Sequence, residues 1–161
     1  MSDIIEKLKA SFEKLKTEPN ICLFLGITPV ELKPGEAVFE MTAKPEHSNF
    51  TGTLHGGIMV DICDVAMGLA VASVLDESKS FTTIDLQMHY FRPVFIGTKI
   101  KAIAKVIKQG SAISYAEAEL RDDKDKLVAK AQSNLMILNK DQSKNRPMRV
   151  WVFSGFVFYN T

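Results

Sequence analysis

A loop that ends in two glycines and is followed by a carboxylate is the part of this 161-residue chain best suited to chemistry. The loop is Asn49-Phe50-Thr51-Gly52-Thr53-Leu54-His55-Gly56-Gly57, and an almost entirely apolar segment containing Asp64 follows it. Bare backbone N–H groups at a helix start can receive a developing negative charge. A carboxylate in apolar surroundings is a candidate base or nucleophile. Together these features indicate chemistry at a carbonyl group.

The spacing of Gly57 and Asp64 places both on one side of a helix. Seven residues at about 100° each put them on one face, about 10 Å apart along the axis. A water molecule, a carbonyl and two hydrogen bonds can roughly span that gap, so one chain or two can form the site. Structural roles stay open as well: the glycines allow close packing of the helix start, and a buried Asp64 can bond to backbone or a hydroxyl.

The other reactive side chains give weaker indications. Cys63 precedes Asp64, but adjacent helix positions point about 100° apart, and the absence of a nearby cation favours core packing over nucleophilic attack. His47 and His89 are expected at surface or strand positions. The three histidines are scattered, so no metal site is predicted.

Helices are expected at three places. The apolar run after the loop predicts a long helix over residues 55–76, buried on most sides. Apolar spacing near the start predicts an amphipathic helix over residues 3–16. Pro19 ends that helix or opens a short one around residues 20–24.

About six strands are expected around the long helix. Short turns between most of them imply antiparallel pairing, and the layout is α+β, with an antiparallel sheet wrapped around one central helix. Within the third strand, alternation puts Thr83 on the polar face with Asp85, Gln87 and His89. The predicted strands cover residues 25–32, 37–42, 81–91, 99–107, 112–120 and 127–138.

Composition excludes several classes of function. The net charge is +1 and no basic stripe is interleaved with aromatic residues, so no nucleic-acid partner is expected. The longest apolar run, residues 65–75, is too short to span a membrane, and no signal peptide is predicted. Cys22 and Cys63 lie in apolar segments without metal-site spacing, which is typical of a reduced, cytoplasmic protein.

The last segment differs from the rest of the chain. Residues 1–139 are expected to form one domain with an N-terminal helix, and residues 140–161 a tail of uncertain role. The tail is first polar and basic, then strongly apolar and aromatic over residues 150–159. Two interpretations remain open: a strand or arm that packs on a neighbour, and a non-native extension.

Three motifs resemble a known family. They are the loop–His-Gly-Gly–helix–Asp pattern, Tyr90-Phe91-Arg92-Pro93, and Val106-Ile107-Lys108-Gln109-Gly110 at a later turn. Together they resemble the hotdog-fold acyl-CoA thioesterases, especially the PaaI-like branch that includes the thioesterase superfamily member 2 type. The resemblance covers residues 20–139, and its most specific part is the Asn-x5-His-Gly-Gly-x6-Asp spacing.

The resemblance implies a hydrolase of acyl-CoA thioesters that needs no metal or redox cofactor. It implies that the sheets of two protomers join edge to edge, and that two such dimers often form a homotetramer. It also implies that active sites lie at the dimer interface and draw residues from both chains. The acyl group stays open.

Residue roles follow by position from the same resemblance. Asp64 matches the carboxylate that activates water or attacks the carbonyl, and Gly57 the residue whose N–H polarises the thioester oxygen. Asn49 matches a residue that helps hold the carbonyl, and His55 the histidine that orders the loop. Thr83 stands where mammalian-type enzymes have a serine that positions the water.

Four more positions are candidates for substrate binding. Gly56 lies at the helix start, while Arg92, Lys108 and Gly110 are candidates for contact with the CoA part of the substrate. Solvated side chains are the alternative for the two cations. Asp61 has no counterpart in the family and is interpreted as an interface or network residue.

Two rival functions use the same fold. A non-catalytic module that binds acyl-CoA need not keep a carboxylate at position 64. A dehydratase of 3-hydroxyacyl thioesters needs a histidine and a carboxylate converging on the β-carbon, and His55 and Asp64 lack the expected spacing.

Overall fold

The computed structural model describes residues 6, 10, 19–140, 149–153 and 156–160, the last two ranges for the backbone only. Apart from Glu6 and Ala10, which are helical, the helix predicted over residues 3–16 lies outside the described residues. Within the described part of the chain, no helix is long and apolar enough to cross a membrane.

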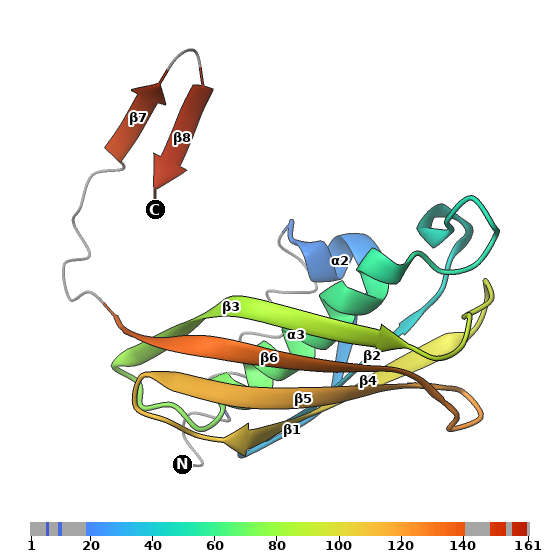
Figure 1. The fold of residues 1–161 in the computed structure, drawn as a ribbon, viewed down its shortest axis with the longest axis horizontal. Coiled ribbons are helices and arrows are strands. Elements are labelled where there is room, and N and C mark those ends of the chain that lie inside the picture. The colour runs from blue at the N-terminus through green and yellow to red at the C-terminus, as the bar shows by residue number, and fades with distance from the viewer. Residues whose placement is uncertain (1–5, 7–9, 11–18, 141–148, 154–155, 161) are drawn as a thin grey trace.

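A six-stranded antiparallel sheet forms the body of the molecule (Figure 1). The α+β class and the strand count predicted from sequence are both confirmed. The strand order is not the chain order, because β3 (Lys79–Tyr90) pairs with β6 (Leu127–Asn139) at the far edge and not with β4 (Lys99–Lys108), which follows it in sequence. Across the sheet the strands are β1 (Thr28–Lys33), β2 (Glu36–Thr42), β4 (Lys99–Lys108), β5 (Ile113–Asp122), β6 (Leu127–Asn139) and β3 (Lys79–Tyr90).

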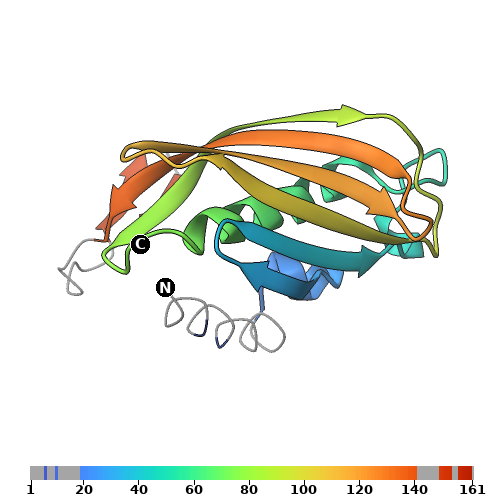
Figure 2. The ribbon, with the colours of Figure 1, turned by 90° about the horizontal axis from the view of Figure 1, so that it is seen from below.

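One long helix, α3 (Gly56–Ala72), lies against the inner face of this sheet. The sheet curves over the helix as a single layer (Figure 2). Apolar side chains occur around most of the helix, which explains its burial between the sheet and the segments beside it. The strands face it with small side chains, which lets the helix pack closely: Ala37, Ala102, Ala104, Ala116, Ala118, Ala129 and Ala131 are all buried.

The helix ends four residues earlier than predicted. Its last turn tightens, because Val74 N–H donates to Val71 O and Leu75 N–H to Ala72 O. At the end of the helix, the buried Ser73 hydroxyl accepts a hydrogen bond from Gly35 N–H (2.8 Å). It also lies 3.0 Å from Lys33 O, so the β1–β2 turn is tied to this end of α3.

One short helix comes before β1, and another comes between β2 and α3. The short helix expected around residues 20–24 is α2 (Ile21–Leu25), capped by the Asn20 side chain, which accepts from Leu23 N–H. Leu25 is therefore helical and not extended as predicted, and β1 begins only at Thr28. A 3₁₀ helix, η1 (Pro45–His47), leads into the loop before α3.

The tail contains a separate two-stranded sheet, formed by β7 (Arg149–Phe153) and β8 (Phe156–Asn160). The strands pair antiparallel from Arg149 opposite Asn160 to Phe153 opposite Phe156. Part of the predicted tail is thus strand. Its packing on a neighbour, and a domain boundary near residue 139, stay predictions.

Candidate active site

The start of α3 is capped by the residue that precedes it. His55 has extended backbone geometry, and its Nδ1 accepts a hydrogen bond from Gly57 N–H at 2.9 Å. Since Nδ1 is the acceptor, it carries no proton in this geometry. The N–H that sequence reasoning assigned to a substrate oxygen is therefore paired with the imidazole of the same loop. A methyl group at Gly57 would approach His55 Nδ1 to 3.0 Å, so a side chain here would press on the cap.

Tyr90, at the end of β3, packs against the same helix start. Its hydroxyl donates to Gly56 O at 3.1 Å. A methyl group at Gly56 would approach the Tyr90 ring to 3.2 Å, so glycine leaves room for the ring. Burial raises the pKa of the Tyr90 hydroxyl, which therefore remains a donor at neutral pH. Tyr90 belongs to the Tyr90-Phe91-Arg92-Pro93 motif, but its contact with the helix start is not predicted from the sequence.

The Asn49 side chain holds the loop before the helix. Its Oδ1 accepts from Thr51 N–H (2.9 Å) and from Thr53 N–H (3.2 Å). Its Nδ2 donates to Thr53 Oγ1 at 3.0 Å. An amide carries two N–H donors, so one donor of Asn49 is used here and a second is available. At the tip of the held loop, Phe50 is fully exposed.

Asp64 and Thr83 come together two turns further along α3. Thr83 Oγ1 donates to Asp64 Oδ1 at 2.9 Å. Strict alternation along β3 would place Thr83 on the outer face with Asp85. A β-bulge between these two residues changes the register against β6 and leaves Ile84 without a partner. The predicted face of Thr83 was therefore wrong, because the bulge turns it toward the helix.

Two residues near Asp64, Cys63 and Asp61, have raised pKa values. Burial raises the pKa of the Cys63 thiol to about 12, and the charge of Asp64 adds to the effect. Cys63 is fully buried, so it is a core residue, as the sequence indicated. Burial also raises the pKa of Asp61; the Asp64 carboxylate adds to the rise and His55 opposes it. Asp61 is thus part of the same electrostatic group as Asp64 and His55.

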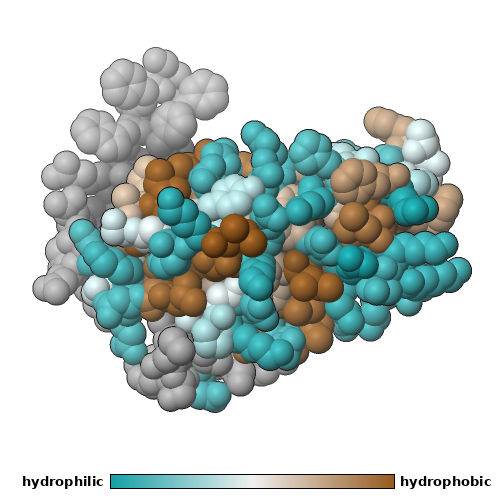
Figure 3. All heavy atoms as spheres, turned by 60° about the horizontal axis from the view of Figure 1, so that its bottom comes forward, coloured by the Kyte–Doolittle hydropathy of each residue, from teal (hydrophilic) through white to brown (hydrophobic). Residues whose placement is uncertain are grey.

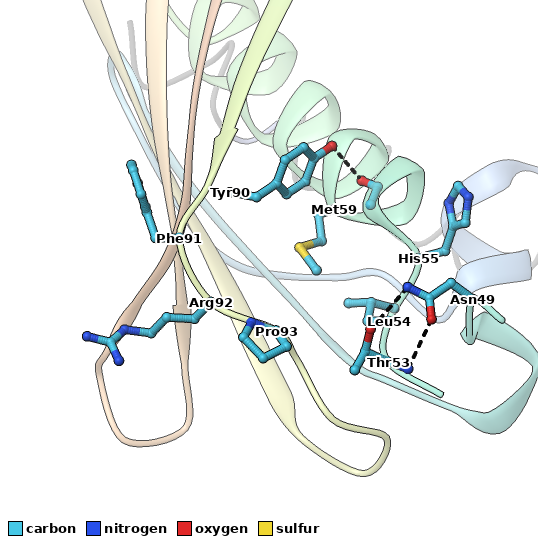
Figure 4. Close-up of a pocket in the computed structure, with 10 residues that line it drawn as sticks. Asn49, Thr53, Leu54, His55, Met59, Tyr90, Phe91, Arg92 and Pro93 are labelled. Atoms are coloured by element: carbon cyan, nitrogen blue, oxygen red, sulfur yellow. Dashed lines mark hydrogen bonds between the residues drawn. The ribbon is translucent and has the colours of Figure 1, made fainter. Parts of the chain in front are cut away.

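A cavity of about 520 Å³ opens beside the helix start (Figure 4). Figure 4 shows the Met59 side chain between Tyr90 and the loop, with the His55 ring turned away from both Tyr90 and Met59. Asp64, Thr83 and Gly57 are not among the lining residues. The cavity is lined by Asn49, Thr53, Leu54, His55, Gly56, Met59, Tyr90, Phe91, Arg92 and Pro93.

The predicted site residues therefore fall into three groups. Asn49, His55, Gly56 and Arg92 surround the cavity, and Gly57 lies behind its His55 cap. Asp64 and Thr83 form a separate pair. Lys108 and Gly110 lie at the β4–β5 turn, where neither lines this cavity.

Gly110 has a structural reason to be glycine. A methyl group there would lie 2.1 Å from Ile113 O, which the turn cannot accommodate. Lys108 is exposed at the end of β4.

The histidines differ from expectation at one position. His47 is only 2% exposed and not on the surface, because its Nδ1 accepts from Lys44 N–H and its carbonyl accepts from His55 N–H. It thus supports the loop that carries His55. His89 lies exposed on β3, as predicted. Among the described residues, no three His, Cys, Asp or Glu side chains are grouped so that they could hold a metal ion.

Comparisons with known proteins agree with this architecture. The model of the Thioesterase superfamily matches residues 51–129. A putative esterase of Saccharolobus solfataricus is 34% identical over 140 residues, which is 86% of this chain and 99% of the relative. Acyl-coenzyme A thioesterase 13 of Homo sapiens is 28% identical over 82% of this chain and 95% of its own length.

A solved structure shares the fold over most of its length. The crystal structure of zebrafish thioesterase superfamily member 2 has a TM-score of 0.72 and 26% identity, covering 81% of this chain and 96% of that chain. The fold of this chain, a single helix against a six-stranded sheet, is the fold of this solved relative. The glycine-led helix start fits the same family. The chain belongs to the thioesterase superfamily, in the PaaI-like branch of the hotdog thioesterases.

Proposed function

We propose that this protein is an acyl-CoA thioesterase that hydrolyses the thioester to a carboxylic acid and CoA. The observation that carries the proposal is the Asp64 carboxylate, placed on the central helix and held by the Thr83 hydroxyl at 2.9 Å. A binding module has no need for an oriented carboxylate at this position. The name of the human relative, acyl-coenzyme A thioesterase 13, supports the same substrate class.

Asp64 drives the attack on the thioester carbonyl. As a general base it takes a proton from water, whose oxygen bonds to the carbonyl carbon. The tetrahedral intermediate collapses with cleavage of the C–S bond, CoA leaves as thiolate, and the proton on Asp64 is available to it. As a nucleophile, Asp64 would instead form an acyl anhydride that water then hydrolyses. Thiolate is a good leaving group, so neither route needs a full catalytic triad.

The helix start stabilises the developing oxyanion. Gly57 N–H lies in the first turn, where backbone dipoles favour negative charge. The substrate oxygen takes the place of His55 Nδ1 as the acceptor for this N–H. The second N–H of Asn49 Nδ2 is a further donor, while the first keeps the loop in place through Thr53. His55 thus positions the loop and does not act as a base.

Two copies of the chain build each site. Among the described residues, β1 and β3 are the free edges of the sheet. β1 is short and irregular: it carries Pro29 and a register shift beside it. β3 has 12 residues and no proline, so it is the edge suited to pairing.

Pairing along β3 changes which Asp64 is near the cavity. If two β3 strands pair antiparallel about their midpoint, the partner's Thr83 lies opposite residue 86. Tyr90, at the cavity, is then about four residues (~13 Å) along the strand from the partner's Thr83. It is seven residues (~23 Å) from its own Thr83. In this pairing the carboxylate held by the partner's Thr83 lies nearer to Tyr90 along the strand than this chain's own pair, so the proposal takes a homodimer or a dimer of dimers as the active form.

Both free cysteines are buried, and neither forms a disulfide, which suits a reducing compartment. The proposal therefore places the reaction in the cytoplasm.

The test is release of free thiol from a panel of short-chain, medium-chain and aryl acyl-CoAs. The proposal predicts turnover of at least one class, and no release from any class contradicts it. Calorimetry on the same panel identifies a binding module, which would bind without hydrolysis. Absorbance of crotonyl-CoA identifies a dehydratase, which would hydrate the double bond.

A further inference from the structure

A second cavity, of about 340 Å³, adjoins the first. The two cavities share Arg92 and Pro93 as lining residues, so one extended ligand can occupy both. The second cavity is bounded on its other side by the β5–β6 turn. The loop between β3 and β4, which carries Phe95, also lines the second cavity.

Three cations line the second cavity: Arg92, Lys124 and Lys126. None of their charged groups forms an ion pair or side-chain hydrogen bond with another described residue. Several other surface cations are paired, as Lys99 is with Glu40 and Lys130 with Glu117, whereas Lys101 and Lys108 on β4 have no such partner among the described residues. Figure 4 shows the Arg92 side chain extending away from Met59 and the loop. Hydrophilic side chains gather at the end of the molecule where the β5–β6 turn lies, at the right of Figure 3.

The β5–β6 turn is fixed by its own acidic residue. Asp122 Oδ1 accepts from the backbone N–H groups of Lys124 (2.9 Å) and Lys126 (2.8 Å). Asp125 adopts a positive φ of 58° and donates its N–H to Asp122 O, closing the turn. One oxygen of the Asp122 carboxylate is therefore bonded to the backbone of the turn, which presents two lysines on a defined scaffold. Asp123 is the second carboxylate in the lining, so three cations face two anions.

We propose that the second cavity binds the phosphorylated nucleotide end of CoA while the thioester occupies the first. This inference rests on the proposed function, whose substrate carries a pyrophosphate and a 3′-phosphate. Arg92 stands at the junction of the two cavities, and Lys124 and Lys126 meet the phosphates beyond it. Phe95 is 64% exposed and offers a face on which adenine can stack. The nucleotide subsite is thus at the β5–β6 turn and not at Lys108 and Gly110.

The test compares two substrates that share one acyl group: the acyl-CoA and the acyl-pantetheine, which lacks all phosphates. In the double variant Lys124→Ala/Lys126→Ala, KM for acyl-CoA should rise about tenfold with kcat unchanged, because two charge-assisted contacts are lost. The effect should shrink at high salt. kcat/KM for acyl-pantetheine should not change.

A matched control removes two lysines elsewhere. Lys101→Ala/Lys105→Ala, on exposed positions of β4 outside both cavities, should leave both substrates unaffected. An unchanged KM for acyl-CoA in the Lys124/Lys126 variant, or an equal change for both substrates, would overturn the proposal. So would a CoA-specific rise in KM confined to Lys108→Ala, which would place the phosphates at the β4–β5 turn.

Failure of the proposed function has a different signature. In that case the wild-type protein releases thiol from neither substrate. Calorimetry with CoA itself then decides the subsite: about tenfold weaker binding by the Lys124/Lys126 variant supports it. Equal binding by the variant and the wild type overturns it.

Discussion

Asp64 owes its hydrogen bond to one irregularity of the backbone. Without the bulge between Thr83 and Asp85, the Thr83 hydroxyl would face solvent and leave the carboxylate without this donor. The donor fixes one oxygen of Asp64, so the other is free to face water or the carbonyl. We therefore propose that Thr83 is a positioning residue that acts through Asp64.

Replacing Thr83 tests this role with a matched pair of variants. Thr83→Val keeps the shape and removes the hydroxyl, so kcat should fall about 10- to 100-fold, the scale of one hydrogen bond to a charged group. Thr83→Ser keeps the hydroxyl and should stay near the wild-type rate. Equal rates for the valine and serine variants would show that the hydroxyl plays no part.

Charged Asp61 lowers the stability of the folded state, and this effect depends on pH. Burial and the Asp64 charge raise its pKa above 3.8, so the folded state disfavours its charged form. This penalty is fully present above the folded pKa and disappears as pH falls toward the unfolded value. Asp61→Asn should therefore raise Tm at pH 7 and lose that gain below about pH 4. A gain that is the same at both pH values would contradict the electrostatic cause.

The central helix is held in place by apolar packing along its length and by one polar contact at its end. Alanines on four strands let the helix approach the sheet, and Ser73 links its last turn to the β1–β2 turn. The turn needs Gly35, whose φ is +76°. These contacts set the distance between the helix and β1–β2, and hence the shape of the core around Asp64.

Ser73→Ala tests the polar contact. The N–H of half-buried Gly35 would lose its acceptor, and the free energy of unfolding should fall by about 1–3 kcal/mol. Urea unfolding measures this change. Ser111→Ala, at an exposed turn position, is the control and should be near neutral. A Ser73 variant as stable as this control would rule out a stabilising role for the contact.

The elements with strong periodicity could be predicted from sequence, and the irregular ones could not. The apolar run of α3 and the alternation in β4, β5 and β6 follow directly from burial on one face. The bulge at Ile84, the end of α3 at Ser73 and the burial of His47 depend on contacts between segments far apart in sequence. The pairing of β3 with β6 is a further example, because no local pattern fixes which strand lies at an edge.

The candidate site, too, could be predicted from the sequence only in part. Residue spacing singled out Asn49, His55, Gly57 and Asp64, but not the bond from Gly57 N–H to His55. The contact of Tyr90 could not be predicted, because tyrosine is common in strands and its hydrogen-bond partner here is a backbone carbonyl. The second cavity could not be predicted, because Arg92 and Lys126 are far apart in sequence and line the same cavity only in the folded chain.

In the whole molecule, the proposed site needs residues from two chains. Two inactive variants test this, each with its fold checked by circular dichroism: Asp64→Asn, and Gly57→Pro, which removes the N–H in the first turn of α3. In an equimolar mixture about half of the dimers are mixed, and each mixed dimer has one intact site of two. The mixture should recover about a quarter of wild-type activity. No recovery from verified mixed dimers would show that each chain builds its own site.

The proposed function depends above all on Asp64, which we propose drives hydrolysis of an acyl-CoA thioester. The most direct measurement is kcat for thiol release by Asp64→Asn, on the best substrate of the panel, with the fold checked by circular dichroism. We expect kcat to fall at least ~100-fold, the usual scale for loss of a catalytic base. A folded Asp64→Asn variant with near wild-type kcat would contradict it.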